Sequence, residues 1–366
     1  MRKIRVGVVG LGLIGKAHLD ALRRLPEVEV TAVCDRDAAA LRSIADRYAV
    51  PLGTGDPAEL IPCVDAVHNC TPNRLHDPVN RLTIAAGKHV YCEKPLSDTA
   101  ADALAVWREA ERAGVLHGLN HQYRMYPALQ EMRARVQSGD AGRIFFAHGR
   151  YHQQSGLYAA DYGWRMTEGG MSCGLSDIGT HWADAARCVL GQEIVRVMAA
   201  VRTIHPVRTK PDGTEIAVST DDLSCVLMEF SGGAQGMLSV SKVSAGHQND
   251  LALAVDAQHF SMRWRQEDPN RLCFGYKNRP DAELRIAPAL VSPDVRDLAT
   301  LPGGHPLGFN DAIFLALRDF YAAARGEIAA SAMRCATFAD GFAGMAFVEA
   351  ALESSRTGRW AETARG

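Results

Sequence analysis

Short apolar runs alternate with amphipathic stretches through the first 120 residues of the chain. This alternation is typical of parallel strands wrapped by helices. The predicted strands are Ile4–Val9, Val28–Cys34, Ala66–Cys70, His89–Cys92 and Leu116–Asn120. The predicted helices are Gly15–Arg24, Ala38–Tyr48, Leu75–Ala86 and Thr99–Ala113. We therefore predict an α/β domain with a doubly wound parallel sheet over residues 1–121.

The pattern then changes, and from Arg143 to about Tyr276 the chain shows alternating strands joined by turn residues. Two of these strands, Leu223–Phe230 and Gln235–Val243, flank the hairpin turn Gly232-Gly233. Helical patterns lie at Pro127–Gln137, Leu175–Leu190, Phe309–Arg325 and Cys335–Ser354. A run of strands with helices set to one side predicts an α+β domain over residues 122–366, an open antiparallel sheet flanked by helices. Residues 279–306, rich in proline and turn residues, are expected to form a long loop.

Composition narrows the class of protein. The 366 residues are 47% hydrophobic and 22% charged, which is ordinary for a soluble globular protein of about two domains. A formal net charge of -2 gives no electrostatic reason to expect nucleic acid or an anionic membrane as a partner. No apolar run approaches the roughly 20 residues of a membrane span, and the N-terminus lacks a signal-peptide pattern. Nine cysteines without a C-x-x-C pair indicate reduced residues, so we expect a cytoplasmic protein.

A glycine turn, Gly10-Leu-Gly12-Leu13-Ile14-Gly15, follows the first strand and opens the first helix. Its glycines permit a tight turn, close approach of the backbone to a pyrophosphate and packing of the helix on the strand. The amides and dipole of the helix then bind the phosphates. About 20 residues further on, Asp35 ends the second strand, where its carboxylate accepts hydrogen bonds from ribose hydroxyls and repels a 2′-phosphate. Arg36 lies directly behind and could soften that repulsion, but we predict a Rossmann site for NAD rather than NADP, with Leu13 and Ile14 in contact.

Two further segments follow strands of the same sheet. Thr71-Pro72-Asn73 comes after the third predicted strand with His76 one turn later, and Glu93-Lys94-Pro95 comes after the fourth. Ligands of doubly wound sheets bind outside the carboxyl ends of the strands. We therefore expect both segments to face the cofactor, although Asn73 or His76 could equally be ordinary cap residues of the next helix.

The order of these motifs carries a resemblance. Glu93-Lys94-Pro95 follows the glycine turn and the T-P-N-x-x-H stretch, and Trp164-Arg165, Gly169-Gly170 and Asp177-Ile-Gly-Thr-His181 follow far downstream. Over essentially its whole length the chain resembles the glucose–fructose oxidoreductase and inositol dehydrogenase family (Gfo/Idh/MocA). The resemblance implies an enzyme that transfers hydride between a secondary hydroxyl of a sugar, glycoside or inositol and nicotinamide. One departure is the longer segment ahead of Asp177, which leaves the individual substrate open.

Oxidation of an alcohol needs a base for the hydroxyl proton, and histidine suits that role. Asp177 and His181 are spaced i, i+4 at a helix start and share one face. The resemblance implies that His181 is the general acid/base, that Asp177 holds the substrate hydroxyl or orients the imidazole, and that Lys94 stabilises the alkoxide. By themselves the two residues are also compatible with a helix-start aspartate and a surface histidine. A zinc site that includes His117 and His121 is the other alternative, but without a cysteine pair or H-E-x-x-H we expect no metal.

The segment from Tyr151 to Arg165 mixes aromatic rings, amides and charges, which suits a polyol or sugar. We expect Tyr151, Trp164 and Arg165 to contact the substrate, although loop aromatics could instead only anchor the loop. The resemblance adds Tyr123 and Arg124 to these residues, and Lys94, Asp177 and His181 as substrate contacts. Within the family the longer aromatic loop is most similar to members acting on sugars or glycosides, with oxidation at C3 to a 3-keto sugar.

Other functions stay open at this point. They are an NADP-dependent sugar or dihydrodiol-type reductase, a redox-neutral NAD-assisted glycoside cleavage, and an NAD-sensing scaffold without enzymatic activity. The presence of Lys94, Asp177 and His181 argues against the scaffold. The resemblance also implies a homodimer or homotetramer formed through the open face of the second sheet, which would cover exposed apolar residues.

Overall fold

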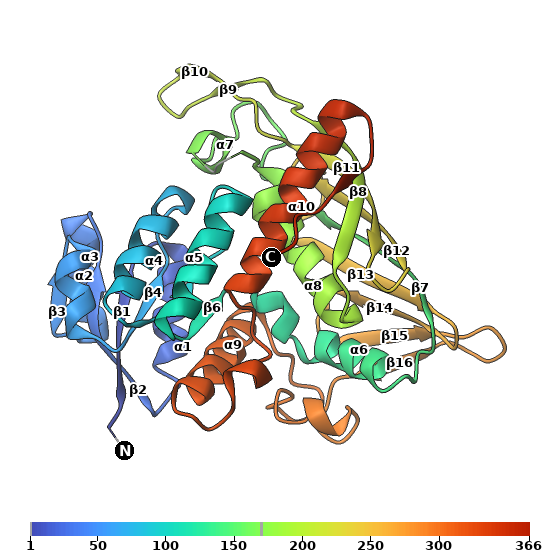
Figure 1. The fold of residues 1–366 in the computed structure, drawn as a ribbon, viewed down its shortest axis with the longest axis horizontal. Helices are drawn as coiled ribbons and strands as arrows, with labels where there is room; N and C mark the ends of the chain where they lie inside the picture. Colours follow the sequence, from blue (N-terminus) through green and yellow to red (C-terminus); the bar gives the residue numbers. More distant parts are fainter. Residues whose placement is uncertain (1, 169–170) are drawn as a thin grey trace. The chain divides into compact units, whose positions relative to one another are not determined.

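The computed structural model describes residues 2–168 and 171–366, so the predicted Gly169-Gly170 motif lies outside the described residues. The chain divides into two compact units, coloured by sequence in Figure 1. The first contains residues 1–122, 309–342 and 366, and the second contains residues 123–308 and 343–365. The sequence predicted one boundary after residue 121, whereas residues 309–342 group with the first unit.

A six-stranded parallel sheet forms the first unit, with the strand order β3-β2-β1-β4-β5-β6. Its strands are β1 (Ile4–Val9), β2 (Val28–Cys34), β3 (Leu52–Thr54), β4 (Ala66–Asn69), β5 (His89–Cys92) and β6 (His117–Leu119). The predicted Rossmann sheet is therefore confirmed. The sequence missed β3, because three residues are too few to show a period.

Helices wind around this sheet in two directions from the boundary between β1 and β4. The α-helices of the unit are α1 (Leu13–Leu22), α2 (Ala38–Tyr48), α3 (Pro57–Leu60), α4 (His76–Ala85), α5 (Ala100–Ala113) and α9 (Phe309–Ala324). Short 3-10 turns are η1 (Ile61–Cys63), η2 (Asn73–Leu75) and η6 (Ala330–Ala332). Helix α9 belongs here because it packs on α1, where Arg24 pairs with Asp311 at 3.0 Å and lies over the Phe314 ring.

The second unit is built on a nine-stranded sheet with the order β16-β15-β14-β13-β7-β12-β11-β8-β17. Its strands are β7 (Ile144–His152), β8 (Ile194–Arg202), β11 (Leu223–Phe230), β12 (Gln235–Ser241), β13 (Asp250–Ala257), β14 (Ser261–Arg265), β15 (Arg271–Gly275), β16 (Ala282–Arg285) and β17 (Ala361–Glu362). A separate ribbon pairs β9 (Val207–Thr209) with β10 (Glu215–Ala217). The sheet is mostly antiparallel as predicted, but β7 and β12 pair in parallel.

Helices border the second sheet. They are α6 (Pro127–Gln137), α7 (Arg165–Glu168), the π-helical turn η4 (Leu175–Gly179), α8 (Thr180–Leu190) and α10 (Phe338–Thr357), with 3-10 turns η3 (Gln122–Met125) and η5 (Pro293–Val295). Helix α8 packs on β7 and β13, and Trp182 Nε1 donates a hydrogen bond to the Ala252 carbonyl at 3.0 Å. Part of the predicted loop 279–306 is instead β16, which pairs with β15. Among residues 2–168 and 171–366, no helix combines the length and apolarity needed to cross a membrane.

Candidate active site

The glycine turn lies between β1 and α1, next to the point where the strand order reverses. Gly10 has a φ of +91°, and a Cβ there would lie 2.5 Å from the Cys70 carbonyl oxygen. A Cβ on Gly15 would clash with the carbonyl oxygen of Gly10. By contrast, a Cβ on Gly12 would meet no protein atom within 4 Å. The outer glycines are thus needed by the protein itself, and Gly12 leaves open space over its backbone, which is what close approach of a pyrophosphate needs.

The N-terminus of α1 fits a phosphate. Its N-cap residue is Gly12, which makes no side-chain cap, and its first turn carries no acidic residue. The first backbone N–H groups of a helix need acceptors from outside the helix, and the helix dipole favours an anion there. Leu13 is 84% exposed beside this terminus. Ile14 follows Leu13 and is partly buried.

Asp35 holds a fixed carboxylate just past the end of β2. Its Oδ2 accepts a hydrogen bond from the Leu11 N–H at 2.7 Å, and its Oδ1 accepts one from the Asp37 N–H at 2.9 Å. Each carboxylate oxygen can accept more than one hydrogen bond, so ribose hydroxyls can still bind. The next residue, Arg36, is exposed. These residues fit the ribose of a dinucleotide.

The loops after β4 and β5 are joined by His76. Its buried ring places Nδ1 2.6 Å from the Pro95 carbonyl and Nε2 2.9 Å from the Thr71 carbonyl. Burial lowers the pKa of His76 from its usual value. The hydroxyl of Thr71 donates to Asn69 Oδ1 at 2.6 Å, and Pro72 is the N-cap of the 3-10 turn that begins at the buried Asn73. His76 thus links the two loops, and its contact with the cofactor stays a prediction.

Glu93 is buried, and Lys94 beside it is partly buried. The Glu93 Oε1 lies 3.0 Å from His18 Nε2 and accepts a hydrogen bond from Asn120 Nδ2 at 2.6 Å. Burial alone would raise the pKa of Glu93, but the His18 hydrogen bond and the charge of Lys94 outweigh it and lower that pKa. Glu93 is therefore an anion that acts electrostatically on Lys94.

Asp177 lies in the π-helical turn η4, which continues directly into α8. The predicted helix 175–190 is therefore present, but its first turn is wound more widely, as occurs often at functional sites. The Asp177 Oδ2 pairs with Lys242 Nζ at 2.6 Å, and its Oδ1 lies 3.2 Å from Arg165 Nε. Arg165 was predicted as a site residue. Lys242 was not, although it is one of only seven lysines in the chain.

Lys242 follows β12, and its side chain is only 6% exposed. Burial would lower the pKa of Lys242, but the charge of Asp177 and the hydrogen bond to it outweigh burial and raise that pKa. The pair is therefore an ammonium and a carboxylate with little water between them. The two residues are 65 positions apart in the sequence, so no local pattern could have paired them.

The buried His181 lies against two tyrosines. The centroid of its ring is 4.7 Å from that of Tyr123 in an edge-on arrangement, and 6.3 Å from that of Tyr151. Tyr151 donates to Asn249 Oδ1 at 2.7 Å, and Asn249 Nδ2 donates to the Tyr123 hydroxyl at 2.9 Å. Tyr123 then donates to Tyr151 at 3.0 Å, which closes a ring of hydrogen bonds. The structure thus brings together three predicted residues, and it adds Asn249.

Two other predicted substrate residues have protein partners. Arg124 forms a buried two-pronged ion pair with Asp184, in which Arg124 Nε lies 2.9 Å from Asp184 Oδ2. This pair gives Arg124 a structural role, and its contact with the substrate stays a prediction. The partly buried Trp164 packs under Arg165, whose guanidinium carbon lies 4.4 Å from the ring centroid. Trp164 therefore helps to position the guanidinium that contacts Asp177.

The segment before Asp177 is anchored by Asp221. This buried carboxylate accepts hydrogen bonds from the N–H groups of Cys173, Gly174 and Leu175 at 2.9, 3.0 and 2.9 Å. It also accepts one from the Ser172 hydroxyl at 2.5 Å. Asp221 therefore fixes the approach to η4, a role that the sequence did not reveal.

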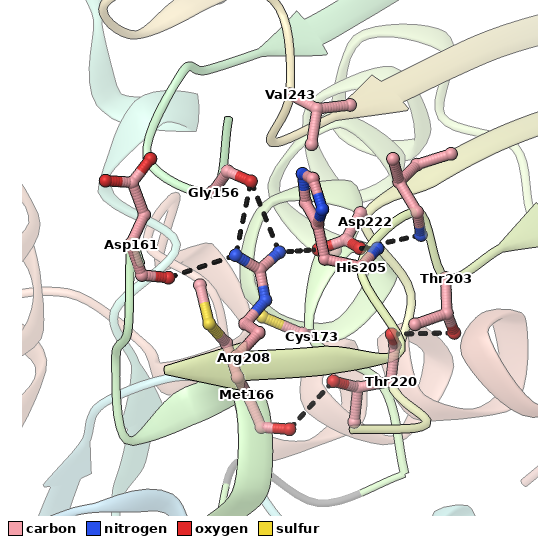
Figure 2. A network of polar contacts seen from close by, with 12 residues as sticks. Gly156, Asp161, Met166, Cys173, Thr203, His205, Arg208, Thr220, Asp222 and Val243 are labelled. Carbon is pink, nitrogen blue, oxygen red and sulfur yellow. Dashed lines mark hydrogen bonds and ion pairs between the residues drawn. The ribbon is translucent and has the colours of Figure 1, made fainter. Parts of the chain in front are cut away.

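A second buried network fixes the aromatic loop (Figure 2). The fully buried guanidinium of Arg208 in β9 donates to the carbonyls of Tyr158 and Asp161 at 2.9 and 3.0 Å, and to Asp222 Oδ1 at 2.5 Å. Asp222 Oδ2 in turn accepts from the N–H of His205 at 3.1 Å. The carbonyls of loop residues 156–161 are therefore held in place by a buried charge.

Comparison with known proteins places the two units in one family. The profile of the oxidoreductase family with an NAD-binding Rossmann fold (GFO/IDH/MocA) matches residues 4–121, and that of the GFO/IDH/MocA C-terminal domain matches residues 129–262. Levoglucosan dehydrogenase of Pseudarthrobacter phenanthrenivorans is 27% identical and covers 99% of this chain and 98% of its own length. D-glucoside 3-dehydrogenase of Escherichia coli is 30% identical over 54% of this chain and 57% of its own.

Among solved structures, an inositol dehydrogenase homolog complexed with NAD+ from Azotobacter vinelandii superposes with a TM-score of 0.87. It is 25% identical, and the match covers 99% of this chain and 97% of that one. The resemblance predicted from the separated motifs is thus confirmed across both units. The chain belongs to the GFO/IDH/MocA family of oxidoreductases and is an enzyme of the dehydrogenase type.

Proposed function

We propose that this chain is an NAD-dependent dehydrogenase that oxidises a secondary hydroxyl of a sugar, glycoside or inositol. The observation that carries the proposal is the Asp177 carboxylate, four residues before the buried His181 and ion-paired with both Lys242 and Arg165. The levoglucosan and glucoside dehydrogenases among the relatives support a carbohydrate substrate.

The two ion pairs of Asp177 indicate that Asp177 and His181 have different roles. A carboxylate that two cations stabilise is a weak base, because protonation would leave a buried ammonium without its partner. The hydroxyl proton therefore goes to the imidazole of His181. An uncharged imidazole accepts a proton readily near pH 7. Asp177 accepts a hydrogen bond from a neighbouring substrate hydroxyl and orients the sugar.

Bound NAD supplies the acceptor for the hydride that leaves the alcohol carbon. The amides at Gly12, Leu13 and Ile14 would hold its pyrophosphate, and Asp35 its ribose. Lys94 donates a hydrogen bond to the alcohol oxygen as negative charge develops there. Glu93 keeps that ammonium paired and oriented between turnovers.

Asp35 favours NAD over NADP. Its carboxylate is already fixed by two backbone N–H groups, so it cannot turn away from a 2′-phosphate without losing both hydrogen bonds. Repulsion between the two anions then disfavours NADP. Arg36 is exposed and screened by water, which weakens any compensation.

The substrate we favour within this class is a glycoside oxidised at C3 to a 3-keto sugar. The aromatic loop supports this choice, since aromatic faces stack on the C–H faces of pyranose rings. The hydrogen bonds from Arg208 hold this loop in place, which would favour one orientation of a bound ring. The D-glucoside 3-dehydrogenase relative points in the same direction.

The test is a panel of inositols, aldoses, anhydrosugars and glycosides assayed by NADH absorbance, with NADP in parallel reactions. We expect at least one carbohydrate to reduce NAD, with product analysis placing the new carbonyl at C3. Faster reduction of NADP would overturn the cofactor assignment. Cleavage of a glycoside without accumulation of NADH would instead indicate that the enzyme catalyses redox-neutral glycoside cleavage.

Self-association is part of the same proposal. Leu227 on β11 pairs in register with Met237 on β12, and their side chains are 49% and 45% exposed. Half-exposed apolar side chains at the middle of a sheet favour cover by another surface. We propose that a second copy of the chain covers them in a homodimer or homotetramer, in the cytoplasm. Light scattering should give a multiple of the 39.6 kDa protomer mass, and Leu227→Asp should reduce it.

A further inference from the structure

Within the first unit, a chain of hydrogen-bonded buried side chains links helix α9 to Glu93. Tyr321 of α9 lies with its hydroxyl 2.8 Å from His68 Nε2. His68 Nδ1 lies 2.8 Å from His18 Nδ1, and His18 Nε2 lies 3.0 Å from Glu93 Oε1. The tyrosine and both histidines have no exposed surface. The family motif at Glu93 is therefore connected to three residues that no motif includes.

A second chain ends on the same oxygen atom. The Tyr91 hydroxyl donates to Asn120 Oδ1 at 3.2 Å, and Asn120 Nδ2 donates to Glu93 Oε1 at 2.6 Å. Both chains begin at a tyrosine hydroxyl and reach Glu93 Oε1. The side chains of the two chains also pack together, since the ring of Tyr91 stacks on His68 and meets His18 edge-on.

With Glu93 ionised and both histidines neutral, the contacts admit one arrangement of protons. The ionised Glu93 only accepts hydrogen bonds, so His18 donates to it from Nε2. A neutral His18 then accepts at Nδ1, which requires His68 to donate from its own Nδ1. His68 in turn accepts at Nε2, and Tyr321 supplies that proton. Burial holds the pKa of His68 well below its usual value, which agrees with a neutral ring.

Protonation of Glu93 would reverse the histidine part of this arrangement. A protonated Oε1 would donate to His18 Nε2, so His18 would carry its proton on Nδ1 and His68 on Nε2. The two tautomers of the histidines thus report the charge of Glu93. A buried network whose members are all satisfied holds its charged end firmly, whereas a partly satisfied one does not.

We propose that His18 and His68 are positioning residues whose hydrogen-bond chain from Tyr321 holds the Glu93 carboxylate ionised and oriented beside Lys94. The proposal rests on the proposed function for the consequence, namely that Lys94 acts on the alcohol oxygen. It does not rest on that function for the tautomers, which the first unit defines by itself.

Histidine 15N NMR of the full-length protein with and without NADH tests the tautomers directly. We expect His18 as the Nε2–H tautomer and His68 as the less common Nδ1–H tautomer, assigned by loss of each signal in His18→Gln and His68→Phe. The reversed pair of tautomers, or an imidazolium at either position, would overturn the proposal. This readout needs no substrate, so it separates failure of the network from failure of the sugar dehydrogenase assignment.

Two substitutions at His18 test the consequence. Glutamine offers one acceptor and one donor, as neutral His18 does, whereas leucine offers neither. We expect His18→Leu to lower kcat about 10- to 100-fold, the range for loss of a hydrogen bond to a charged group, with KM for the sugar changed less. His18→Gln should recover most of that loss. The matched control is His117→Gln, a buried histidine of the same sheet that bonds instead to Glu111.

The kinetic results distinguish a positioning role of His18 from a merely structural one. A loss of kcat in His18→Leu that His18→Gln recovers, with His117→Gln near the parent enzyme, supports a positioning role. Equal loss in both His18 variants, or a His18→Leu enzyme no slower than the His117→Gln control, would refute it. If His18→Leu does not fold, the histidine tautomers still decide.

Discussion

Replacement of Lys242 with methionine removes one charge from the ion pair beside the proposed base and keeps a long unbranched side chain. The Lys242 and Asp177 side chains are only 6% and 15% exposed, so water can replace the lost ammonium poorly. Asp177 would be left with Arg165, whose Nε lies at 3.2 Å and whose side chain is 40% exposed. The substitution therefore tests how much the structure depends on the pair.

The expected loss of stability follows from the burial of this pair and from the remaining contact with Arg165. Removal of one partner from a fully buried ion pair typically costs about 3–5 kcal/mol, because the other charge stays buried without compensation. The remaining guanidinium of Arg165 offsets part of this cost, so we expect Lys242→Met to lower the free energy of unfolding by about 2–3 kcal/mol. We also expect kcat to fall at least about 10-fold, since Asp177 becomes a stronger base and competes for the proton.

The assay is chemical denaturation of Lys242→Met beside Lys210→Met, a matched control in the same unit. Lys210 is partly exposed and lies 5.9 Å from the Tyr162 ring centroid, so its loss should cost less than about 1 kcal/mol. The pKa of Lys242 is raised above 10.5 in the folded state. Its contribution is therefore complete below pH 10.5 and is lost as the pH rises through the higher folded value.

The stability difference between the parent and Lys242→Met should thus stay constant between neutral pH and mildly alkaline pH, and then shrink at strongly alkaline pH. A Lys242→Met protein that is as stable and as active as Lys210→Met would refute the argument. Such a result would mean that Asp177 is solvated well enough to need no buried partner.

Four other substitutions test separate features of the molecule. Gly12→Ala should fold normally but weaken NADH binding in fluorescence titrations at least about 10-fold, whereas Gly10→Ala, at φ +91° against backbone atoms, should also lower Tm. Asp35→Ser should shift the ratio of NADP(H) to NAD(H) affinity upward by about 10-fold or more, and an unchanged ratio would reject its role in selecting the cofactor. The Arg5 side chain holds the pKa of Asp65 at about 2, so the stability difference between the parent and Asp65→Asn should be present above pH 3.8 and disappear as the pH falls through about 2 in denaturation series. An Asp65→Asn difference that persists at pH 2 would contradict this linkage.

The sequence predicted the first unit well because its signals are local. Helix Ala38–Tyr48 and strand Val28–Cys34 have the predicted bounds, since the apolar pattern of each lies within the segment itself. The same reasoning missed β3, and it placed a loop where β16 pairs with β15. Both strands are short and depend on a neighbour for their structure, which a period cannot reveal.

The candidate site was only partly predictable for a similar reason. Asp177 and His181 lie four residues apart, so one helix start brings them together. Lys242 and Asn249 reach the same site from β12 and the segment before β13, and pairing over such distances depends on the order of strands in the sheet. The sequence likewise gave no sign that β7 and β12 pair in parallel, or that residues 309–342 belong to the first unit.

The central claim is that His181 takes the hydroxyl proton while Asp177 stays ionised. The most direct test is the single-turnover rate of NADH formation by His181→Ala, with and without added imidazole, beside His247→Ala as a control outside the site. We expect His181→Ala to be slower by about 100-fold or more, with a rate that rises with imidazole concentration, and His247→Ala to keep the parent rate. A His181→Ala enzyme that forms NADH at the parent rate, or whose lost activity no concentration of imidazole restores, would contradict the claim.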